Sequence, residues 1–208
     1  PSLILTGPPG CGKTTIARII INHSKCPCCS FSCCTASISE IRVVAEKAEK
    51  EFRSTGFPSI LFLDEIQACP AAINKLRYFY EKMPRLHVIA AGSLLEFALR
   101  DLPSFGVGRI RSIFMYSFCF QEFLWALGKR SLADMIVHAT PFSPLPELIH
   151  TKALEYLRTF LVIGGMPECV STYVQTENML ECQQVLNELM QSYQDDFKKY
   201  HEKVPVGL

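Results

Sequence analysis

Apolar residues in the first part of the chain follow two patterns that alternate along the sequence. Short continuous apolar runs predict buried strands at residues 2–6, 59–63, 86–91 and 110–118. Apolar residues at helical spacing predict helices over residues 13–23, 38–52, 70–83 and 93–102. Strands that alternate with helices predict an α/β fold, in which about five parallel strands form the middle of three layers.

The pattern changes near residue 120 and is almost wholly helical beyond it. Helical spacing covers residues 120–138, 145–160 and 178–201. Stretches rich in proline or glycine separate these segments and indicate loops. We therefore predict two domains, a sheet domain over residues 1–118 and a helical lid or linker over residues 119–208.

Composition and charge narrow the class of protein. The chain has 208 residues, of which 49% are hydrophobic, enough for one sizeable core or for a core with a small helical appendage. Its 21 basic and 20 acidic side chains give a net charge of +1, so the overall charge does not indicate binding to nucleic acid or to acidic membranes. Because no apolar run reaches the roughly 18 residues that span a bilayer, we expect no membrane association.

The N-terminal sequence and the cysteines indicate a piece of a longer intracellular protein. The chain starts at Pro1, inside a predicted strand, and has no basic leader of the kind that begins a signal peptide. Five of its ten cysteines crowd between residues 26 and 34. We expect free thiols in a loop or a poorly formed strand, because thiols stay reduced inside cells. A zinc site in this cluster is the alternative.

A glycine-rich motif follows the first predicted strand and opens the first predicted helix. It fits G-x-x-x-x-G-K-[ST] at each defined position, and its predicted nucleotide-binding residues are Gly7, Pro8, Pro9, Gly10, Cys11, Gly12, Lys13, Thr14 and Thr15. Glycines let successive main-chain N–H groups point at phosphate oxygens, and the helix dipole adds to them. We expect Lys13 to reach the β- and γ-phosphates of ATP and Thr14 to ligate Mg²⁺.

Two adjacent carboxylates end the strand that begins at residue 59. Asp64 and Glu65 follow an apolar run, so the strand delivers them to the sheet edge beside the phosphate loop. We expect Asp64 to hold Mg²⁺ through its water shell. A hydrolase must orient and polarise a water molecule, which a second carboxylate can do. Glu65 therefore favours an ATPase over a small-molecule kinase.

Two further residues are candidates for the catalytic set. Ser93 follows the strand that we expect beside the Asp64 strand, where its hydroxyl could bond the attacking water or the γ-phosphate. A helix N-cap is an equally good interpretation of Ser93. Arg109 precedes the last predicted strand and could stabilise transition-state charge in its own or a neighbouring subunit. The alternative for Arg109 is an ordinary surface arginine.

The N-terminal third carries three stretches that resemble a known family. The stretches are PSLILTGPPGCGKTT (residues 1–15), SEIR (residues 39–42) and ILFLDEI (residues 60–66). Over residues 2–66 the chain resembles the clamp-loader-like AAA+ ATPases of the replication-associated recombination protein A and Werner helicase-interacting protein group. That resemblance implies action at stalled replication forks, with DNA and replication proteins as partners. After residue 66 the family continues with HRFN, whereas this chain has QACP.

Residues 61–208 carry stretches that resemble a second family. They are LFLDEIQ (61–67), LRYFYE (76–81), HVIAAGSLLE (87–96), VGR (107–109), FQEFL (120–124), GGMPE (164–168) and YQDDF (193–197). These are similar to a prokaryotic AAA-type ATPase family whose members carry an uncharacterised C-terminal domain. In that family a glycine–arginine pair before the last strand matches Gly108 and Arg109. The family's Pro-Leu-Ser-Phe pattern is replaced here by Ser117-Phe118-Cys119-Phe120.

Both resemblances share the strand that ends at Asp64 and Glu65, so the chain looks like a hybrid of two related ATPases joined near residue 66. A natural fusion, an error in the gene model and an engineered join would each produce it. We predict Mg²⁺-dependent ATP hydrolysis by an AAA+ core that forms a homo-oligomer, because such cores often use an arginine from a neighbouring subunit. The alternatives are a nucleotide-dependent interaction module with little or no hydrolysis and a small-molecule kinase.

Overall fold

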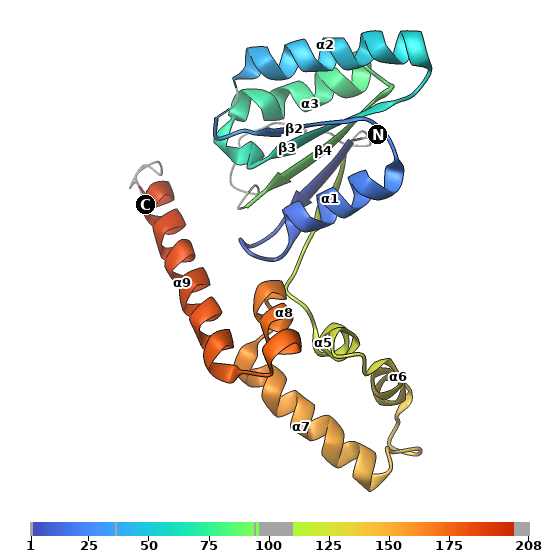
Figure 1. Cartoon of the computed structure of the whole chain (residues 1–208), viewed down its shortest axis with the longest axis vertical. Coiled ribbons are helices and arrows are strands. Elements are labelled where there is room, and N and C mark those ends of the chain that lie inside the picture. Colours follow the sequence, from blue (N-terminus) through green and yellow to red (C-terminus); the bar gives the residue numbers. More distant parts are fainter. Residues whose placement is uncertain (1, 36, 94, 96–109, 202–208) are drawn as a thin grey trace. The chain divides into compact units, whose positions relative to one another are not determined.

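The computed structural model describes residues 2–35, 37–93, 95 and 110–201 (Figure 1). The chain divides into two units. One contains Pro1–Pro8 and Gly12–Tyr116, and the other contains Pro9–Cys11 and Ser117–Leu208. The first unit holds the sheet, and the described elements of the second are helices. The predicted domain boundary at residue 118 lies two residues beyond Tyr116, and the extent of the ATPase domain stays a prediction.

The sheet has five parallel strands in the order β2-β3-β4-β1-β5. The strands are β1 (Ser2–Thr6), β2 (Cys28–Ser32), β3 (Ser59–Asp64), β4 (Leu86–Gly92) and β5 (Ile110–Phe114). Parallel pairing puts the carboxyl ends of β1, β3 and β4 at one edge of the sheet, which is the edge where the predicted site residues follow their strands. The α/β prediction with about five strands is confirmed. The cysteine-rich stretch forms the edge strand β2, and β5 ends at Phe114 rather than at residue 118.

Helices cover both faces of this sheet. The helix α1 (Lys13–Ser24) lies on one face, and α2 (Ile38–Thr55) and α3 (Pro70–Lys82) lie on the other (Figure 1). Alternate residues of β3 pack to opposite sides: Leu61 and Leu63 join the core under α2 and α3, whereas Ile60 and Phe62 join the core under α1. All four are buried. The three predicted layers follow from this burial of β3 on both faces.

The boundaries of α2 come from capping residues that the sequence displays. Ser37 and Glu40 have capping-box spacing, and the main-chain N–H of Glu40 donates to Ser37 Oγ at 3.3 Å. The Ser37 N–H in turn donates to Glu40 Oε2 at 2.7 Å. At the other end Gly56 has a φ of 77°, and its N–H donates to the Phe52 carbonyl at 2.7 Å.

The inner face of α2 is the basis of a stability prediction. Ile41 is fully buried in the core under α2 and α3. We expect Ile41→Ala to lower the free energy of unfolding by about 2–5 kcal/mol, because it leaves a cavity in a packed interior. Val43 is 64% exposed on the same helix, so Val43→Ala should change this free energy by about 0.5 kcal/mol or less. Urea denaturation of the full chain, followed by circular dichroism, measures both. Equal losses would mean that α2 does not pack as described.

The second unit consists of α5 (Phe120–Ala126), α6 (Arg130–His138), α7 (Glu147–Ile163), α8 (Pro167–Thr176) and α9 (Met179–His201). The single helix predicted over residues 120–138 is wrong. It is broken at Gly128, which has a φ of 72° and donates its N–H to the Trp125 carbonyl at 3.0 Å. The helix α8 was not predicted, because Pro167 starts a helix here instead of ending one.

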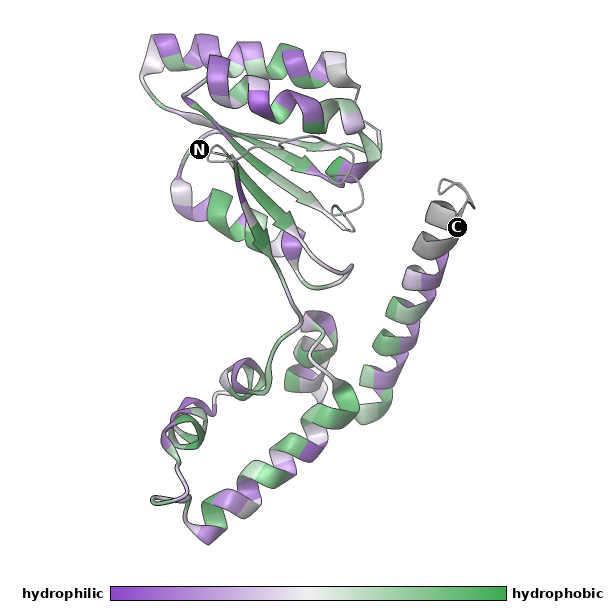
Figure 2. Cartoon of the chain, turned by 180° about the vertical axis from the view of Figure 1, so that it is seen from behind, coloured by the Kyte–Doolittle hydropathy of each residue, from purple (hydrophilic) through white to green (hydrophobic). Residues whose placement is uncertain are grey.

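Hydropathy follows the packing of each unit. Figure 2 shows mostly apolar strands in the sheet and mixed colouring along the helices that cover it. The core of the second unit is formed by Phe123, Leu124, Ala133, Ile163, Cys169, Val170 and Cys182. Within the part of the chain that the structure describes, no helix is long and apolar enough to cross a membrane.

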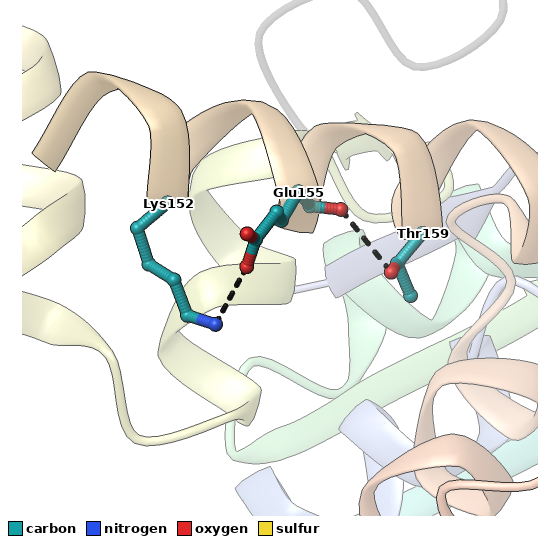
Figure 3. Close-up of polar contacts among 3 residues, drawn as sticks. All are labelled: Lys152, Glu155 and Thr159. Carbon is teal, nitrogen blue, oxygen red and sulfur yellow. Dashed lines mark hydrogen bonds and ion pairs between the residues drawn. The ribbon is translucent and has the colours of Figure 1, made fainter. Parts of the chain in front are cut away.

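An ion pair stabilises the exposed face of α7 only slightly. Lys152 Nζ lies 2.6 Å from Glu155 Oε2, and the Thr159 hydroxyl donates to the Glu155 carbonyl at 3.3 Å (Figure 3). The hydrogen bond to Glu155, helped by its charge, raises the pKa of the Lys152 ammonium. Both side chains of the pair are more than half exposed, so solvent screens the attraction.

Candidate nucleotide-binding site

The loop between β1 and α1 turns through glycines and leads directly into the N-terminus of α1. Gly7 and Gly12 have φ angles of 141° and 88°, which residues with a Cβ atom rarely adopt. Gly12 is the N-cap residue of α1, and no side chain caps the main-chain N–H groups of the first turn. That turn carries no acidic residue either. Uncapped N–H groups and the positive end of the helix dipole together favour an anion at this position.

Lys13 is held at this loop by hydrogen bonds. Its ammonium donates to the Gly7 carbonyl at 3.0 Å and to the Pro8 carbonyl at 2.7 Å. The residue is only 7% exposed, so the loop and not the solvent surrounds its long side chain. A buried ammonium at a helix N-terminus adds a full positive charge to the partial charges of the N–H groups. The same ammonium can donate to phosphate oxygens, as the sequence motif predicts.

Thr14 and Asp64 come from different elements and meet at the sheet edge. Thr14 lies in the first turn of α1, and Asp64 is the last residue of β3. The Thr14 hydroxyl lies 3.1 Å from both carboxylate oxygens of Asp64, which share its single hydrogen. A hydroxyl and a carboxylate are hard oxygen ligands of the kind that Mg²⁺ takes beside substrate phosphates and water. The residues present therefore fit the predicted metal.

Glu65 directly follows this carboxylate in an unusual main-chain conformation. Its φ is 53°, in the left-handed region that few non-glycine residues adopt. Its N–H donates to Asp64 Oδ1 at 3.2 Å, and its carbonyl accepts from the Ala68 N–H at 2.9 Å. Strained conformations of this kind persist where surrounding bonds hold them, and they are frequent at active sites.

Gln67 links Glu65 to Ser93 and was not singled out from the sequence. Gln67 lies in the short 3₁₀ helix η1 (Ile66–Ala68), and its Nε2 donates to Glu65 Oε2 and, at 3.1 Å, to Ser93 Oγ. Ser93 is 5% exposed and directly follows β4, which pairs with β3. The expectation that the Ser93 strand lies beside the Asp64 strand is thus met. Two sequence signals could have indicated Gln67: its place two residues after Glu65 and its place at the end of the LFLDEIQ stretch (61–67).

Several predicted site residues cannot be placed in this arrangement. Pro9, Gly10 and Cys11 fall in the second unit, whereas the rest of the loop falls in the first. Thr15 is exposed in the first turn of α1. Arg109 lies outside the described residues, as does most of the helix that Ser93 was expected to cap. The roles of all these residues stay predictions.

The cysteines take no part in a visible metal centre. All ten have free thiols. Among the residues with a described placement, no group of three or more His, Cys, Asp or Glu side chains gathers to hold a metal. Burial, together with the charges of Cys69, Cys34 and the two site carboxylates, raises the pKa of Cys33 to about 12. Cys33 is therefore protonated at neutral pH, which makes it an unreactive thiol.

Comparison with known proteins gives one family and several partial relatives. A family model described as an AAA domain matches residues 1–124. ATPase WRNIP1 of Dictyostelium discoideum is 42% identical over 66 residues, which are 32% of this chain and 7% of that protein. Replication-associated recombination protein A of Escherichia coli K12 is 42% identical over 65 residues, which are 31% of this chain and 14% of that protein.

A third relative widens the range of AAA proteins that the chain matches. Cell division control protein 48 homolog C of Arabidopsis thaliana is 39% identical over 69 residues, 32% of this chain and 8% of that protein. The chain thus spans at most about a seventh of the length of these relatives. The family match extends to both sides of residue 66, where the two sequence resemblances meet, and covers more than half of the chain. The chain therefore belongs to the AAA domain family.

Proposed function

We propose that this chain is the Mg²⁺-dependent, ATP-hydrolysing core of an AAA ATPase. The observation that carries the proposal is the 3.1 Å approach of the Thr14 hydroxyl to the Asp64 carboxylate, beside a loop that holds the Lys13 ammonium. Lys13 and Thr14 begin the helix that follows β1, whereas Asp64 ends β3, and these two strands are not neighbours in the sheet because β4 lies between them. Chance glycine turns and isolated acidic strand ends do not produce this combination.

Each residue has a part in the proposed chemistry. The N–H groups at the start of α1 and the Lys13 ammonium bind the phosphates, and Thr14 and Asp64 would hold Mg²⁺. When bound, the metal neutralises charge that develops on the phosphate oxygens. A water oxygen bonds to the γ-phosphorus while the bond from that phosphorus to the β,γ-bridging oxygen breaks. Glu65 orients this water and takes its proton, which passes on to the released phosphate.

The partners and the cellular process rest on likeness alone. The name of replication-associated recombination protein A of Escherichia coli supports a role in replication or recombination, with DNA or replication proteins as partners. The membership in the AAA family supports a homo-oligomer, in which Arg109 could act on the nucleotide of its own or a neighbouring subunit. An ATPase is expected inside the cell, where ATP is supplied, and the proposal leaves open the cytoplasm and the nucleus.

Phosphate release tests the proposal. The purified full chain is incubated with ATP and Mg²⁺, with and without forked DNA, and inorganic phosphate is measured over time. Catalytic release supports the ATPase, and a higher rate with forked DNA supports the replication role. ATP binding without release under both conditions would favour the nucleotide-dependent interaction module. Phosphoryl transfer to an added nucleotide acceptor would favour the kinase.

The charge of Asp64 sets the expected dependence on Mg²⁺. Asp64→Asn keeps an oxygen that accepts from Thr14 but removes the negative charge. We therefore expect the Mg²⁺ concentration for half-maximal phosphate release to rise by about tenfold or more, since groups that orient metal-bound water have effects of that size. A magnesium titration at fixed ATP measures it. Asp134→Asn, an exposed change on α6, is the matched control and should leave the titration unchanged.

A further inference from the structure

The side-chain amide of Gln67 uses both of its hydrogens at the candidate site. Its Nε2 donates to the Glu65 carboxylate and to the Ser93 hydroxyl, the second bond being 3.1 Å long. An amide nitrogen carries two hydrogens, so these two bonds use its donor capacity completely. Ser93 is far from Gln67 in sequence, and it lies beside Gln67 only because β3 and β4 are neighbouring strands. Gln67 is therefore the one described side chain that bonds to both residues.

The orientation of this amide is fixed by chemistry and by packing. The opposite orientation would place the amide oxygen against the Glu65 carboxylate, where two acceptors repel. In the observed orientation Oε1 is buried, and it has no hydrogen-bond partner within the described residues. A Cβ added at Gly92 would lie 2.5 Å from this oxygen and 3.3 Å from Ile66 Cγ2, so the amide packs against the Gly92 main chain. A buried acceptor without a partner is costly, and an apolar side chain of similar volume would avoid that cost.

Main-chain hydrogen bonds fix the backbone of Glu65 but not its carboxylate. Hydrogen bonds to Asp64 Oδ1 and from the Ala68 N–H fix the Glu65 backbone at a φ of 53°. The carboxylate lies beyond several rotatable bonds, which these main-chain contacts do not restrain. The bond from Gln67 restrains its far end.

We propose that Gln67 is a positioning residue for the hydrolysis step, an inference that rests on the proposed ATPase function. Its amide holds the Glu65 carboxylate and the Ser93 hydroxyl at a fixed separation, so that both groups can bond to the same water molecule. Among the described residues, the Gln67 side chain donates to Glu65 and Ser93, whereas Lys13 and Thr14 bond to the loop carbonyls and to Asp64. Gln67 should therefore govern the rate of hydrolysis and leave ATP affinity unchanged.

Gln67→Leu separates these two quantities. Leucine has a similar volume and no donors, so the carboxylate and the hydroxyl lose their link. We expect single-turnover hydrolysis to slow by about 10- to 100-fold, because small displacements of reacting groups cost rates of that order. The Kd for ATP, measured by equilibrium binding without turnover, should stay within about twofold, since only interactions confined to the transition state are lost. Gln184→Leu, an exposed change on α9, is the matched control.

A double variant distinguishes positioning from a general structural effect. If Gln67 acts through Glu65, adding Gln67→Leu to Glu65→Gln should slow hydrolysis no further, because coupled residues are not additive. Gly92→Ala is an independent route, because its Cβ displaces the Gln67 amide without changing a polar group. It should slow hydrolysis in the same way and serves if Gln67→Leu fails to fold.

The outcomes separate failure of this inference from failure of the proposed function. A wild-type chain that binds ATP but releases no phosphate would overturn the ATPase proposal and the role of Gln67 with it. A wild-type chain that hydrolyses ATP while Gln67→Leu and Gly92→Ala keep its rate would overturn the role of Gln67 alone. Additive losses in the double variant, or a parallel rise in the Kd for ATP, would reduce Gln67 to a structural residue.

Discussion

Replacing Lys13 by alanine is expected to abolish ATP binding at concentrations that saturate the wild-type chain. The Lys13 ammonium is buried against the carbonyls of Gly7 and Pro8, at the mouth of the loop that precedes α1. Hydrogen bonds to charged groups contribute about 1.5–3 kcal/mol each. Losing two such bonds to the β- and γ-phosphates weakens binding by about 100-fold or more. Equilibrium binding of labelled ATP measures the change.

Two further variants show whether the lost charge is the cause. Lys13→Gln keeps an amide that can donate to the loop carbonyls but removes the positive charge, so it should lose nearly as much affinity as Lys13→Ala. Lys50→Ala changes an exposed lysine on α2 and should bind ATP as the wild type does. Affinity retained in Lys13→Ala, with an unchanged circular dichroism spectrum, would contradict the assignment of this loop to phosphate.

The buried strands could be predicted because a continuous apolar run indicates a strand that is covered on both faces. Residues 60–63 are continuously apolar, and the structure buries Leu61 and Phe62 under helices on opposite faces. The break at Gly128 could not be predicted in the same way. Apolar spacing continues on both sides of that glycine, and a helix interior tolerates a single glycine at a cost of only about 1 kcal/mol. Packing of α5 and α6 in the second unit decides the outcome there.

In the candidate site, too, some residues could be predicted from local sequence and others depend on the tertiary structure. The loop, Lys13 and Thr14 could be proposed from sequence because they belong to a motif with a fixed spacing. Asp64 could be proposed because it ends a continuously apolar strand. The link from Gln67 to Ser93 joins residues 26 positions apart and exists only through the pairing of β3 with β4. The two strands were expected side by side, but no local pattern shows which side chain would bond to Ser93. Ser93 illustrates the limit, since its sequence fitted a helix cap and a site hydroxyl equally well.

Glu65→Gln is expected to keep ATP binding and to lose turnover. Glutamine has the same shape, and its amide oxygen can still accept from Gln67, but it cannot take a proton from water. General-base catalysis contributes about 100- to 10,000-fold, so phosphate release should fall by that factor. The Kd for ATP should stay near the wild-type value, because Glu65 bonds to Gln67 and Asp64 and not to the loop. Binding assays and phosphate release on the same preparation measure both quantities.

Comparison of this variant with wild type decides between hydrolysis and simple binding. Glu51→Gln, an exposed change on α2, controls for the loss of one negative charge and should turn over normally. Equal turnover in wild type and Glu65→Gln would remove Glu65 from the reaction, and another group would have to orient the water. Equal binding with no turnover in either chain would instead favour the interaction module. If the wild type is active and Glu65→Gln binds ATP but turns over slowly, the Glu65 carboxylate acts on the water itself, because the substitution changes no other group in the site.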